Sequence, residues 1–234
     1  MRRVLIIIIA YNEDKTVGNV INGLQEVSSE LDCETEILLV DDCSTDETPS
    51  IARNAGVNVV THPTNMGPGA AAQTGFKFAV RNSFDAVVAM DADGQHRPQD
   101  VPELLDSLNK KDVDIVVGSR FLGNFNYEMG VVRYSGIKFY SRLITLITGE
   151  EITDLTSGFR AMTIDVAENY AKRYPKGIVA IDRGLREGLG AFTYREVPVQ
   201  MNGRENGNSF LNIRQLAKYP FRSAHTFFRV ILRM

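Results

Sequence analysis

The stretch Asp85-Ala86-Val87-Val88-Ala89-Met90-Asp91-Ala92-Asp93 is a short apolar run that ends on two carboxylates one residue apart. Continuous apolar character over so few residues is typical of a strand that is buried on both faces of a parallel sheet. Such a strand delivers Asp91 and Asp93 to the carboxyl edge of the sheet, where open α/β sheets bind their ligands.

The two carboxylates of this stretch repel each other unless a cation or a proton lies between them. Mg²⁺ and Mn²⁺ take hard oxygen ligands of this kind and leave coordination positions open for phosphate groups. We therefore predict a divalent metal site at Asp91 and Asp93. The alternative is a turn in which the two side chains cap the next helix, because the residues from His96 to Asp100 have the pattern of a helix start.

Apolar runs rich in Val and Ile alternate with helix-like segments through the first 120 residues. This alternation predicts a doubly wound α/β fold, with a mostly parallel sheet flanked by helices. The expected strands are Val4–Ala10, Glu36–Val40, Val57–Thr61, Ala86–Met90 and Asp114–Val117. The expected helices are Asp14–Leu31, Thr48–Ala55, Pro68–Asn82 and Pro98–Lys110.

The regular alternation ends near Gly118. Residues 131–149 contain three basic residues and no acidic one, and their apolar side chains recur at helical spacing, which predicts an amphipathic helix. We further expect short helices at Thr163–Arg173 and Asp182–Leu189, a strand at Tyr194–Val199, and two helices within residues 210–234 that are separated at Pro220.

The charge of the chain is unevenly distributed. The 234 residues suit one large α/β domain, and their net charge of −3 conceals an asymmetry. Residues 1–130 contain 10 Lys and Arg against 20 Asp and Glu, whereas residues 131–234 contain 16 against 9. The basic second half indicates contact with something anionic, either phosphate groups or a membrane surface, unless it is a solvated basic face.

The cysteines and the amino-terminal apolar run indicate the compartment. Cys33 and Cys43 lack C-x-x-C spacing and a nearby His cluster, which argues against a zinc site and against a disulfide framework. The aliphatic run from Val4 to Ala10 is much shorter than the roughly 20 residues of a spanning helix and has no signal-peptide cleavage pattern. We therefore expect a protein of the reducing cytoplasm that is not secreted and does not itself span a bilayer.

Polar side chains also follow the first two expected strands. The first strand leads into Ala10-Tyr11-Asn12-Glu13 and the second into Asp41-Asp42-Cys43-Ser44-Thr45-Asp46, so both groups reach the same edge as the Asp-x-Asp pair. An Asp at such a position can accept hydrogen bonds from a base or a ribose, and an aromatic ring can lie against a base. We expect a nucleotide here, although Ser44, Thr45 and Asp46 can alternatively cap the following helix.

Two familiar nucleotide-binding motifs are absent from the sequence. There is no G-x-G-x-x-G after the first strand and no G-x-x-x-x-G-K-[ST] at any position. Dinucleotide-binding and P-loop proteins depend on these motifs to cradle phosphates. The sequence therefore does not support assignment to either class of protein.

Six short motifs instead follow one another in a distinctive order. They are Tyr11-Asn12-Glu13, Asp41-Asp42-x-Ser44-Thr45-Asp46, Asn65-x-Gly67, Asp91-Ala92-Asp93-x-Gln95-His96, Gly118-Ser119-Arg120 and Thr156-Ser157-Gly158-Phe159-Arg160. In this order they resemble the family 2 inverting glycosyltransferases of GT-A fold, and are most similar to the dolichyl-phosphate mannose synthase branch, which loads sugars onto polyprenyl phosphates. The resemblance implies a Rossmann-like GT-A domain over residues 1–209, followed by a basic amphipathic helical tail over residues 210–234 that contacts a membrane or a subunit.

The resemblance also implies roles for individual residues. Asp91 and Asp93 match the metal-binding D-x-D, and Gln95 matches a residue that assists the metal, Mg²⁺ or Mn²⁺. Catalytic roles fall to Asp91, Asp93, Arg120, Arg133 and Arg204. The positions that hold the nucleotide sugar are Ala10, Tyr11, Glu13, Asp42, Asp91, Ala92, Asp93, Arg204 and Ser209. Relatives often have Lys where this chain has Pro68 and Phe210.

The acceptor decides whether the reaction needs a general base. A sugar hydroxyl must lose a proton to attack, whereas a phosphate monoester, with a second pKa of about 6, is already ionised at neutral pH. Cations then matter more than a base, and we expect Asp154 to orient an Arg or the sugar. With a hydroxyl acceptor, Asp154 would be the best candidate for the base by its position.

The sequence thus predicts a metal-dependent, inverting transferase that moves a hexosyl group from a GDP-mannose- or UDP-glucose-type donor to a polyprenyl phosphate. We expect it to be peripheral at the cytoplasmic face of an anionic membrane, with a second copy or a membrane-spanning subunit as further candidate partners and no nucleic acid partner. The alternatives are a glycosyltransferase with a sugar or protein hydroxyl as acceptor, and a non-catalytic nucleotide-binding protein built on the same sheet.

Overall fold

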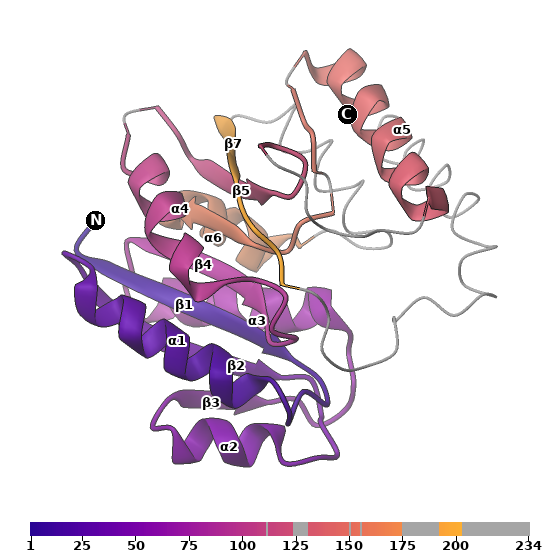
Figure 1. Ribbon diagram of the computed structural model, residues 1–234. Coiled ribbons are helices and arrows are strands. Elements are labelled where there is room, and N and C mark those ends of the chain that lie inside the picture. The colour runs from indigo at the N-terminus through magenta and orange to yellow at the C-terminus, as the bar shows by residue number, and fades with distance from the viewer. Residues whose placement is uncertain (111, 124–130, 150, 155, 175–191, 203–234) are drawn as a thin grey trace.

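The computed structural model describes residues 1–110, 112–123, 131–149, 151–154, 156–174 and 192–202 (Figure 1). Its strands are β1 (Arg3–Ala10), β2 (Glu34–Asp41), β3 (Asn58–Thr61), β4 (Ala86–Asp91), β5 (Ile115–Ser119), β6 (Arg160–Thr163) and β7 (Tyr194–Pro198). Its helices are α1 (Val17–Glu30), α2 (Thr48–Asn54), α3 (Pro68–Arg81), the 3₁₀ helix η1 (Pro98–Asp100), α4 (Val101–Leu108), α5 (Val131–Thr148) and α6 (Ile164–Lys172).

The described strands form one sheet in the order β3-β2-β1-β4-β6-β5-β7. Strand β1 lies between β2 and β4 and is parallel to both. Strand β2 also pairs in parallel with β3, and β5 pairs in parallel with β7. Strand β6 lies between β4 and β5 and is antiparallel to both. The sheet is therefore mostly parallel, as expected from the sequence.

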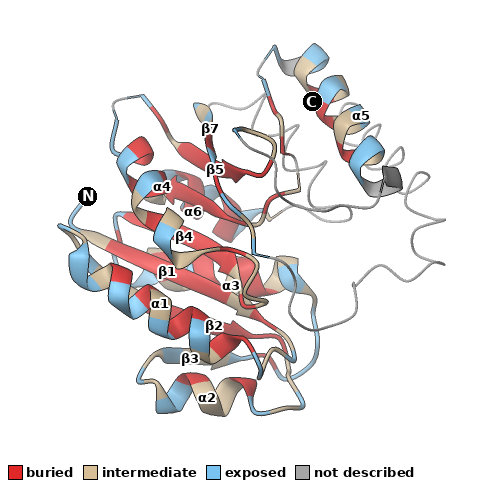
Figure 2. Cartoon of the chain, in the orientation of Figure 1, coloured by how far each residue is buried: buried red, intermediate tan, exposed pale blue. Residues whose placement is uncertain are grey.

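Helices cover both faces of the sheet. Val4, Ile6 and Ile8 of β1 belong to the core cluster that contains buried residues of α1 and α4. Leu5 and Ile7 belong to the cluster on the other face, which contains buried residues of α3 and α6. Figure 2 shows the buried strands between these two layers. Burial on both faces explains why the strands are continuously apolar and do not alternate with polar residues.

The expected elements of the first 120 residues are all present, with their ends displaced by a few residues. The segment expected as one helix from Pro98 begins as η1 and continues as α4, which ends at Leu108. The expectations for residues 131–149, for Thr163–Arg173 and for Tyr194–Val199 correspond to α5, α6 and β7. The segments Asp182–Leu189 and 210–234 lie outside the described residues.

Strand β6 was missed by the sequence analysis. It is four residues long, and it begins with Arg160, whose side chain is fully buried. So short a strand that starts on a charged residue has neither the length nor the apolar pattern that indicates a strand. Because Arg160 pairs with Ala89 of β4, the residues just before β6 lie at the carboxyl edge near Asp91.

The carboxyl ends of β1, β2 and β4 meet at this edge. Ala10 pairs with Asp41, and Ile9 pairs with Asp91, so the loops that follow the three strands start side by side. Among the described helices, none is both long enough and apolar enough to cross a bilayer.

Candidate active site

Asp91 and Asp93 occupy the end of β4 and the turn that follows it. The Asp91 side chain is 45% exposed, and its Oδ2 lies 3.8 Å from Nε2 of the buried His96. The Oδ1 atom of Asp93 accepts a hydrogen bond of 3.1 Å from the backbone N–H of Gln95. Both carboxylates are thus partly accessible at the edge where the sheet was expected to bind a ligand.

Neither carboxylate caps the next helix. The residue at the N-cap of η1 is Arg97, the residue at the N-cap of α4 is Asp100, and neither helix start has a side-chain capping bond. The alternative reading of the Asp-x-Asp pair as a helix cap is therefore wrong.

Gly158 packs directly against Asp91. A Cβ atom built on Gly158 would lie 2.9 Å from the Asp91 Oδ2 atom. The motif Thr156-Ser157-Gly158 precedes β6, so the antiparallel strand brings it against the end of β4. This contact joins two motifs that are far apart in the sequence.

The oxygen donors at this edge fit a Mg²⁺ or Mn²⁺ ion. The described residues contain no group of three or more His, Cys, Asp or Glu side chains that could enclose a metal by themselves. Magnesium commonly binds through one or two carboxylates and completes its shell with water and substrate phosphates. Asp91 and Asp93 match that pattern, and Gln95 lies half-buried on the same turn.

The loops after β1 and β2 are tied to each other by hydrogen bonds. The backbone N–H of Asn12 donates to Ser44 Oγ at 2.9 Å, and the N–H of Thr45 donates to Asn12 Oδ1 at 2.8 Å. Asn12 and Cys43 have positive φ angles of 54° and 67°, which let the two loops turn sharply. Ser44 and Thr45 therefore link the loops and do not cap α2.

Asp46 does bond to the start of α2. Its Oδ1 accepts from the backbone N–H of Thr48 at 3.0 Å, and its Oδ2 accepts from the N–H of Asp14 at 3.2 Å. Asp46 therefore joins the two loops and also bonds to Thr48, the first residue of α2, although the N-cap residue of that helix is Glu47. At the same edge the buried Ala10 ends β1, and the half-buried Tyr11 and Glu13 follow it.

The Asp42 carboxylate is buried and anchors the loop before α3. Its Oδ1 lies 2.8 Å from His62 Nδ1 and accepts from the N–H of Met66 at 2.8 Å, while its Oδ2 accepts from the N–H of Gly67 at 2.6 Å. The other His62 nitrogen, Nε2, lies 2.9 Å from Thr74 Oγ1 of α3. His62 was not singled out in the sequence, because a lone His after a strand has no motif around it.

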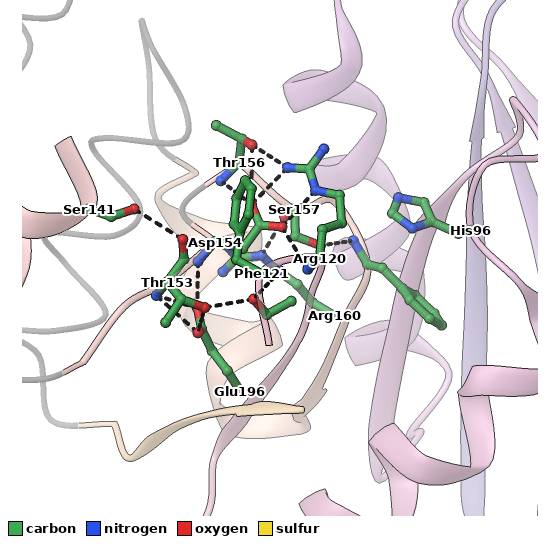
Figure 3. A network of polar contacts seen from close by, with 12 residues as sticks. His96, Arg120, Phe121, Ser141, Thr153, Asp154, Thr156, Ser157, Arg160 and Glu196 are labelled. Carbon is green, nitrogen blue, oxygen red and sulfur yellow. Dashed lines mark hydrogen bonds and ion pairs between the residues drawn. The ribbon is translucent and has the colours of Figure 1, made fainter. Parts of the chain in front are cut away.

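Arg120 and Asp154 form a buried ion pair (Figure 3). Arg120 Nε donates to Asp154 Oδ2 at 2.6 Å, and Nη2 donates to Oδ1 at 2.7 Å and also to Thr156 Oγ1. Burial by itself raises the pKa of the Asp154 carboxyl, but the hydrogen bonds and the charge of Arg120 outweigh it and hold that pKa below its ordinary value. The ion pair fixes the position of the Arg120 guanidinium.

Glu196 of β7 holds the segment that carries Asp154. Its carboxylate accepts hydrogen bonds from the backbone N–H of Thr153 and of Asp154, the latter at 3.0 Å, and from the Thr153 hydroxyl. The Tyr194 hydroxyl donates to the same carboxylate at 2.7 Å, and Thr153 Oγ1 lies 2.6 Å from Ser119 Oγ at the end of β5. Glu196 was also missed, because it lies 42 residues from Asp154 in the chain.

A cavity of about 240 Å³ lies beside Asp91 on the α3 and α6 side of the sheet. Its lining combines Asp91 and the buried Arg160 with the aromatic rings of Phe76, Tyr170 and Tyr174. Arg160 Nε donates to the backbone oxygen of Ser157 at 3.0 Å, so β6 fixes this side chain next to the Thr156-Ser157-Gly158 motif.

Three expected site residues are not placed by the structure. For Arg133 it describes only the backbone, in the first turn of α5, and Arg204 and Ser209 lie outside the described residues. Their roles remain predictions, as do the roles of Arg120 toward phosphate and of Asp42 toward a nucleotide.

The mostly parallel sheet, with helices on both faces and carboxylates at its carboxyl edge, has the architecture expected of a GT-A domain. The chain belongs to glycosyl transferase family 2, whose model matches residues 5–171. It is 31% identical over 223 residues to an undecaprenyl-phosphate mannosyltransferase of Micrococcus luteus, covering 88% of this chain and 86% of the relative. It is 29% identical over 240 residues to a polyprenol monophosphomannose synthase of Mycolicibacterium smegmatis, covering 95% of this chain and 86% of that relative.

Solved structures confirm the fold. A glucosyl-3-phosphoglycerate synthase of Mycobacterium tuberculosis, in complex with Mn²⁺, UDP and glucosyl-3-phosphoglycerate, superposes with a TM-score of 0.67 at 20% identity, covering 98% of this chain and 80% of that one. At this identity the similarity concerns the fold. The family model and the curated relatives confirm the resemblance to family 2 and the expectation of an enzyme.

Proposed function

We propose that this glycosyltransferase moves a hexosyl group, with inversion, from a nucleotide sugar to a polyprenyl phosphate. The names of its relatives support this acceptor, since those from Micrococcus luteus and Mycolicibacterium smegmatis are named for undecaprenyl phosphate and polyprenol. The donor is of the GDP-mannose or UDP-glucose type, in keeping with the nucleotide-binding positions that the sequence motifs imply.

The state of Asp154 is the observation that supports this acceptor most. A general base must be able to take up a proton, yet both oxygens of this buried carboxylate bond to Arg120 and its pKa lies below the ordinary value. Such a group accepts protons poorly at neutral pH. A phosphate acceptor needs no base, because it is already ionised at that pH.

The leaving nucleoside diphosphate needs cations. Negative charge develops on its oxygens during transfer, and a divalent ion together with basic side chains stabilises that charge. We assign the ion, Mg²⁺ or Mn²⁺, to Asp91 and Asp93 with help from Gln95, and phosphate contacts to Arg133, Arg204 and Ser209. Arg120 remains a candidate for the same task, oriented by Asp154.

A lipid acceptor places the enzyme at a membrane. We therefore propose a peripheral location at the cytoplasmic face, in which residues 1–209 form the catalytic domain and the basic segment 210–234 contacts anionic lipid or a partner subunit. This segment contains five Lys and Arg and no acidic residue. Each basic residue near an anionic surface contributes about 1 kcal/mol to attraction.

A product assay tests the proposed function. The full chain is incubated with each of several GDP- and UDP-sugars and with a polyprenyl phosphate, 3-phosphoglycerate or a free sugar as acceptor, in Mn²⁺, in Mg²⁺ or in a chelator. We expect lipid-linked sugar of inverted anomeric configuration, formed only with a divalent ion. Product from a hydroxyl acceptor alone would favour the alternative reaction, and nucleotide binding without any product would favour a non-catalytic protein.

A further inference from the structure

Thr16 stands at the N-cap position of α1 but does not cap that helix. A Thr at this position normally accepts a hydrogen bond from a backbone N–H of the first helical turn. Thr16 makes no side-chain capping bond, and its hydroxyl instead donates to the backbone oxygen of Ala92 at 2.7 Å. Because Thr16 is only 5% exposed, this bond is shielded from water. The hydroxyl therefore serves a segment 76 residues away and not its own helix.

Ala92 lies between the two carboxylates that we assign to the metal. We call residues 91–95 the metal turn. Thr16 contacts this turn on both sides of Asp93. Its hydroxyl bonds to the Ala92 oxygen, and its Cβ and Cγ2 atoms would lie 3.6 Å from a Cβ built on Gly94. A turn that is held directly before and after Asp93 presents this carboxylate in a fixed direction.

The metal turn is held from a second side by Asn202. The backbone N–H of Asn202 donates to the Gln95 oxygen at 3.0 Å, and Asn202 Nδ2 donates to the Gly94 oxygen at 3.2 Å. The Asn202 residue is exposed, so water can replace its side chain as a donor. Loss of the Thr16 hydroxyl would instead leave the buried Ala92 oxygen without this donor, which costs more. Thr16 is thus the contact on which the turn depends more.

Thr16 also lies against the loop that follows β1. Its Oγ1 atom is 3.4 Å from Glu13 Oε2 and 3.4 Å from the backbone oxygen of Glu13. A hydroxyl has one proton to donate, and the much shorter contact to Ala92 takes it. Because Glu13 is one of the positions expected to hold the nucleotide, Thr16 stands between the nucleotide loop and the metal turn.

We propose that Thr16 is a positioning residue of the metal site, whose hydroxyl fixes the metal turn so that Asp91 and Asp93 can bind Mg²⁺ or Mn²⁺ together with a nucleoside diphosphate. This inference rests on the proposed function, which assigns the ion to these two carboxylates. The role of the hydroxyl is indirect, because it acts through the backbone of Ala92. Groups that orient metal ligands indirectly typically change metal affinity by about 10- to 100-fold when they are removed.

Two pairs of side chains that differ by a hydroxyl test this role. Thr16→Val replaces the hydroxyl with a methyl group of similar size, and Thr16→Ala differs from Thr16→Ser by the Oγ atom alone. Mn²⁺ is titrated by calorimetry into the full chain with GDP or UDP present, at a temperature at which thermal scans show each variant to be folded. We expect Thr16→Val and Thr16→Ala to bind Mn²⁺ about 10- to 100-fold more weakly, and Thr16→Ser to keep most of the affinity.

Thr163 provides a matched control. It also stands at the N-cap position of a helix, α6, without a side-chain capping bond, and its buried Oγ1 has no hydrogen-bond partner within the described part of the chain. Thr163 pairs with Ala86 at the start of β4, at the opposite end of that strand from Asp91. Thr163→Val should therefore leave the affinity for Mn²⁺ unchanged.

A transfer assay separates positioning from a general loss of structure. Thr16→Val should need a higher Mn²⁺ concentration for half-maximal transfer to a polyprenyl phosphate, and should recover most of the unchanged rate when Mn²⁺ is in excess. A purely structural role would lower the thermal unfolding midpoint and the amount of active enzyme without changing the Mn²⁺ requirement.

Unchanged Mn²⁺ affinity in either Thr16→Val or Thr16→Ala would overturn the proposal. An equal loss in Thr16→Ser would also overturn it, because the methyl group would then be responsible. Failure of both hydroxyl-free variants to fold would make the hydroxyl a folding element and would likewise overturn it. These outcomes leave the proposed function intact as long as the unchanged chain binds Mn²⁺ and glycosylates a polyprenyl phosphate. Absence of Mn²⁺ binding or of transfer in the unchanged chain would overturn the proposed function itself.

Discussion

Arg120 and Asp154 hold each other in a two-point ion pair, with Nε to Oδ2 at 2.6 Å and Nη2 to Oδ1 at 2.7 Å. Arg120 is 6% exposed and Asp154 is 0% exposed. Because both groups are removed from water, each depends on the other for compensation of its charge. The pair therefore links the stability of the domain to the position of an arginine at the candidate active site.

Replacement of Asp154 by Asn should cost more stability than activity. Removing one partner of a buried ion pair typically costs about 3–5 kcal/mol, because the other charge is left buried without compensation. We expect the free energy of unfolding, measured in urea, to fall by about 3–5 kcal/mol. The enzyme that remains folded should keep substantial turnover with a phosphate acceptor.

The exposed pair Lys172–Glu168 on α6 provides a control for this substitution. Glu168→Gln should change the free energy of unfolding by no more than about 0.5 kcal/mol, since water screens an exposed pair. Complete loss of turnover in a folded Asp154→Asn enzyme would instead indicate a catalytic base, and a hydroxyl acceptor.

The same carboxylate should make the fold sensitive to acid. The pKa of Asp154 is lower in the folded state than its ordinary value of about 3.9, so its contribution to stability is present above that value and is lost as the pH falls through the folded pKa. We expect the stability difference between the unchanged chain and Asp154→Asn to be constant from pH 7 to about pH 5 and to shrink below about pH 4. Urea unfolding at each pH measures it, and a difference that grows in acid would contradict the assigned direction of the shift.

Asp93→Asn should abolish metal-dependent transfer without unfolding the chain. The side chain is partly accessible at the carboxyl edge of the sheet, where it accepts a hydrogen bond from the backbone N–H of Gln95, and its replacement by the isosteric Asn leaves the volume of the side chain unchanged. We expect weaker Mn²⁺ binding by titration calorimetry in the presence of nucleoside diphosphate, and a loss of rate of at least about a hundredfold, as for loss of about 3 kcal/mol of charge stabilisation. Asp106→Asn, an exposed position on α4, is the control, and full activity of Asp93→Asn would refute the metal site.

His62 should affect nucleotide binding through Asp42. His62→Ala removes one hydrogen-bond partner of the buried Asp42 Oδ1 and loosens the loop before α3. We expect the free energy of unfolding to fall by about 1–3 kcal/mol. If Asp42 holds the nucleotide, the same substitution should also lower the affinity for nucleoside diphosphate.

His62→Asn can keep a donor near the place of Nδ1 and should restore part of that affinity, whereas Thr74→Val removes only the contact to Nε2. Affinities for GDP and UDP by calorimetry compare the three variants. Identical nucleotide affinity in all of them would show that Asp42 serves only to anchor the loop.

Gly158→Ala should disturb the metal site with little effect on the fold. The new Cβ would lie 2.9 Å from Asp91 Oδ2, and a half-exposed side chain can move aside at small cost. We expect Mn²⁺ affinity to drop while the thermal midpoint changes by no more than a few degrees, as for a change of about 1 kcal/mol or less. Gly18→Ala on α1, where the Cβ would make an ordinary 3.5 Å contact with Ile51, should leave metal affinity unchanged.

The sequence alone determined the parallel part of the sheet and the place of its ligand edge. Strands buried on both faces read as continuous apolar runs, and polar residues directly after β1, β2 and β4 can only emerge at the carboxyl edge. These are local patterns, so periodicity and chain order suffice to place Tyr11, Asp42, Asp91 and Asp93 together.

Only the tertiary structure decided how the side chains at that edge are used. The short strand β6 brings Gly158 against Asp91. The loop after β5 brings Arg120 to Asp154, and the ring of His62 contacts one carboxylate oxygen of Asp42. Each contact joins residues that are 20 or more positions apart or depends on a strand too short to show a pattern. Local periodicity contains no information about such pairs, because they form only when the sheet has brought distant segments into contact.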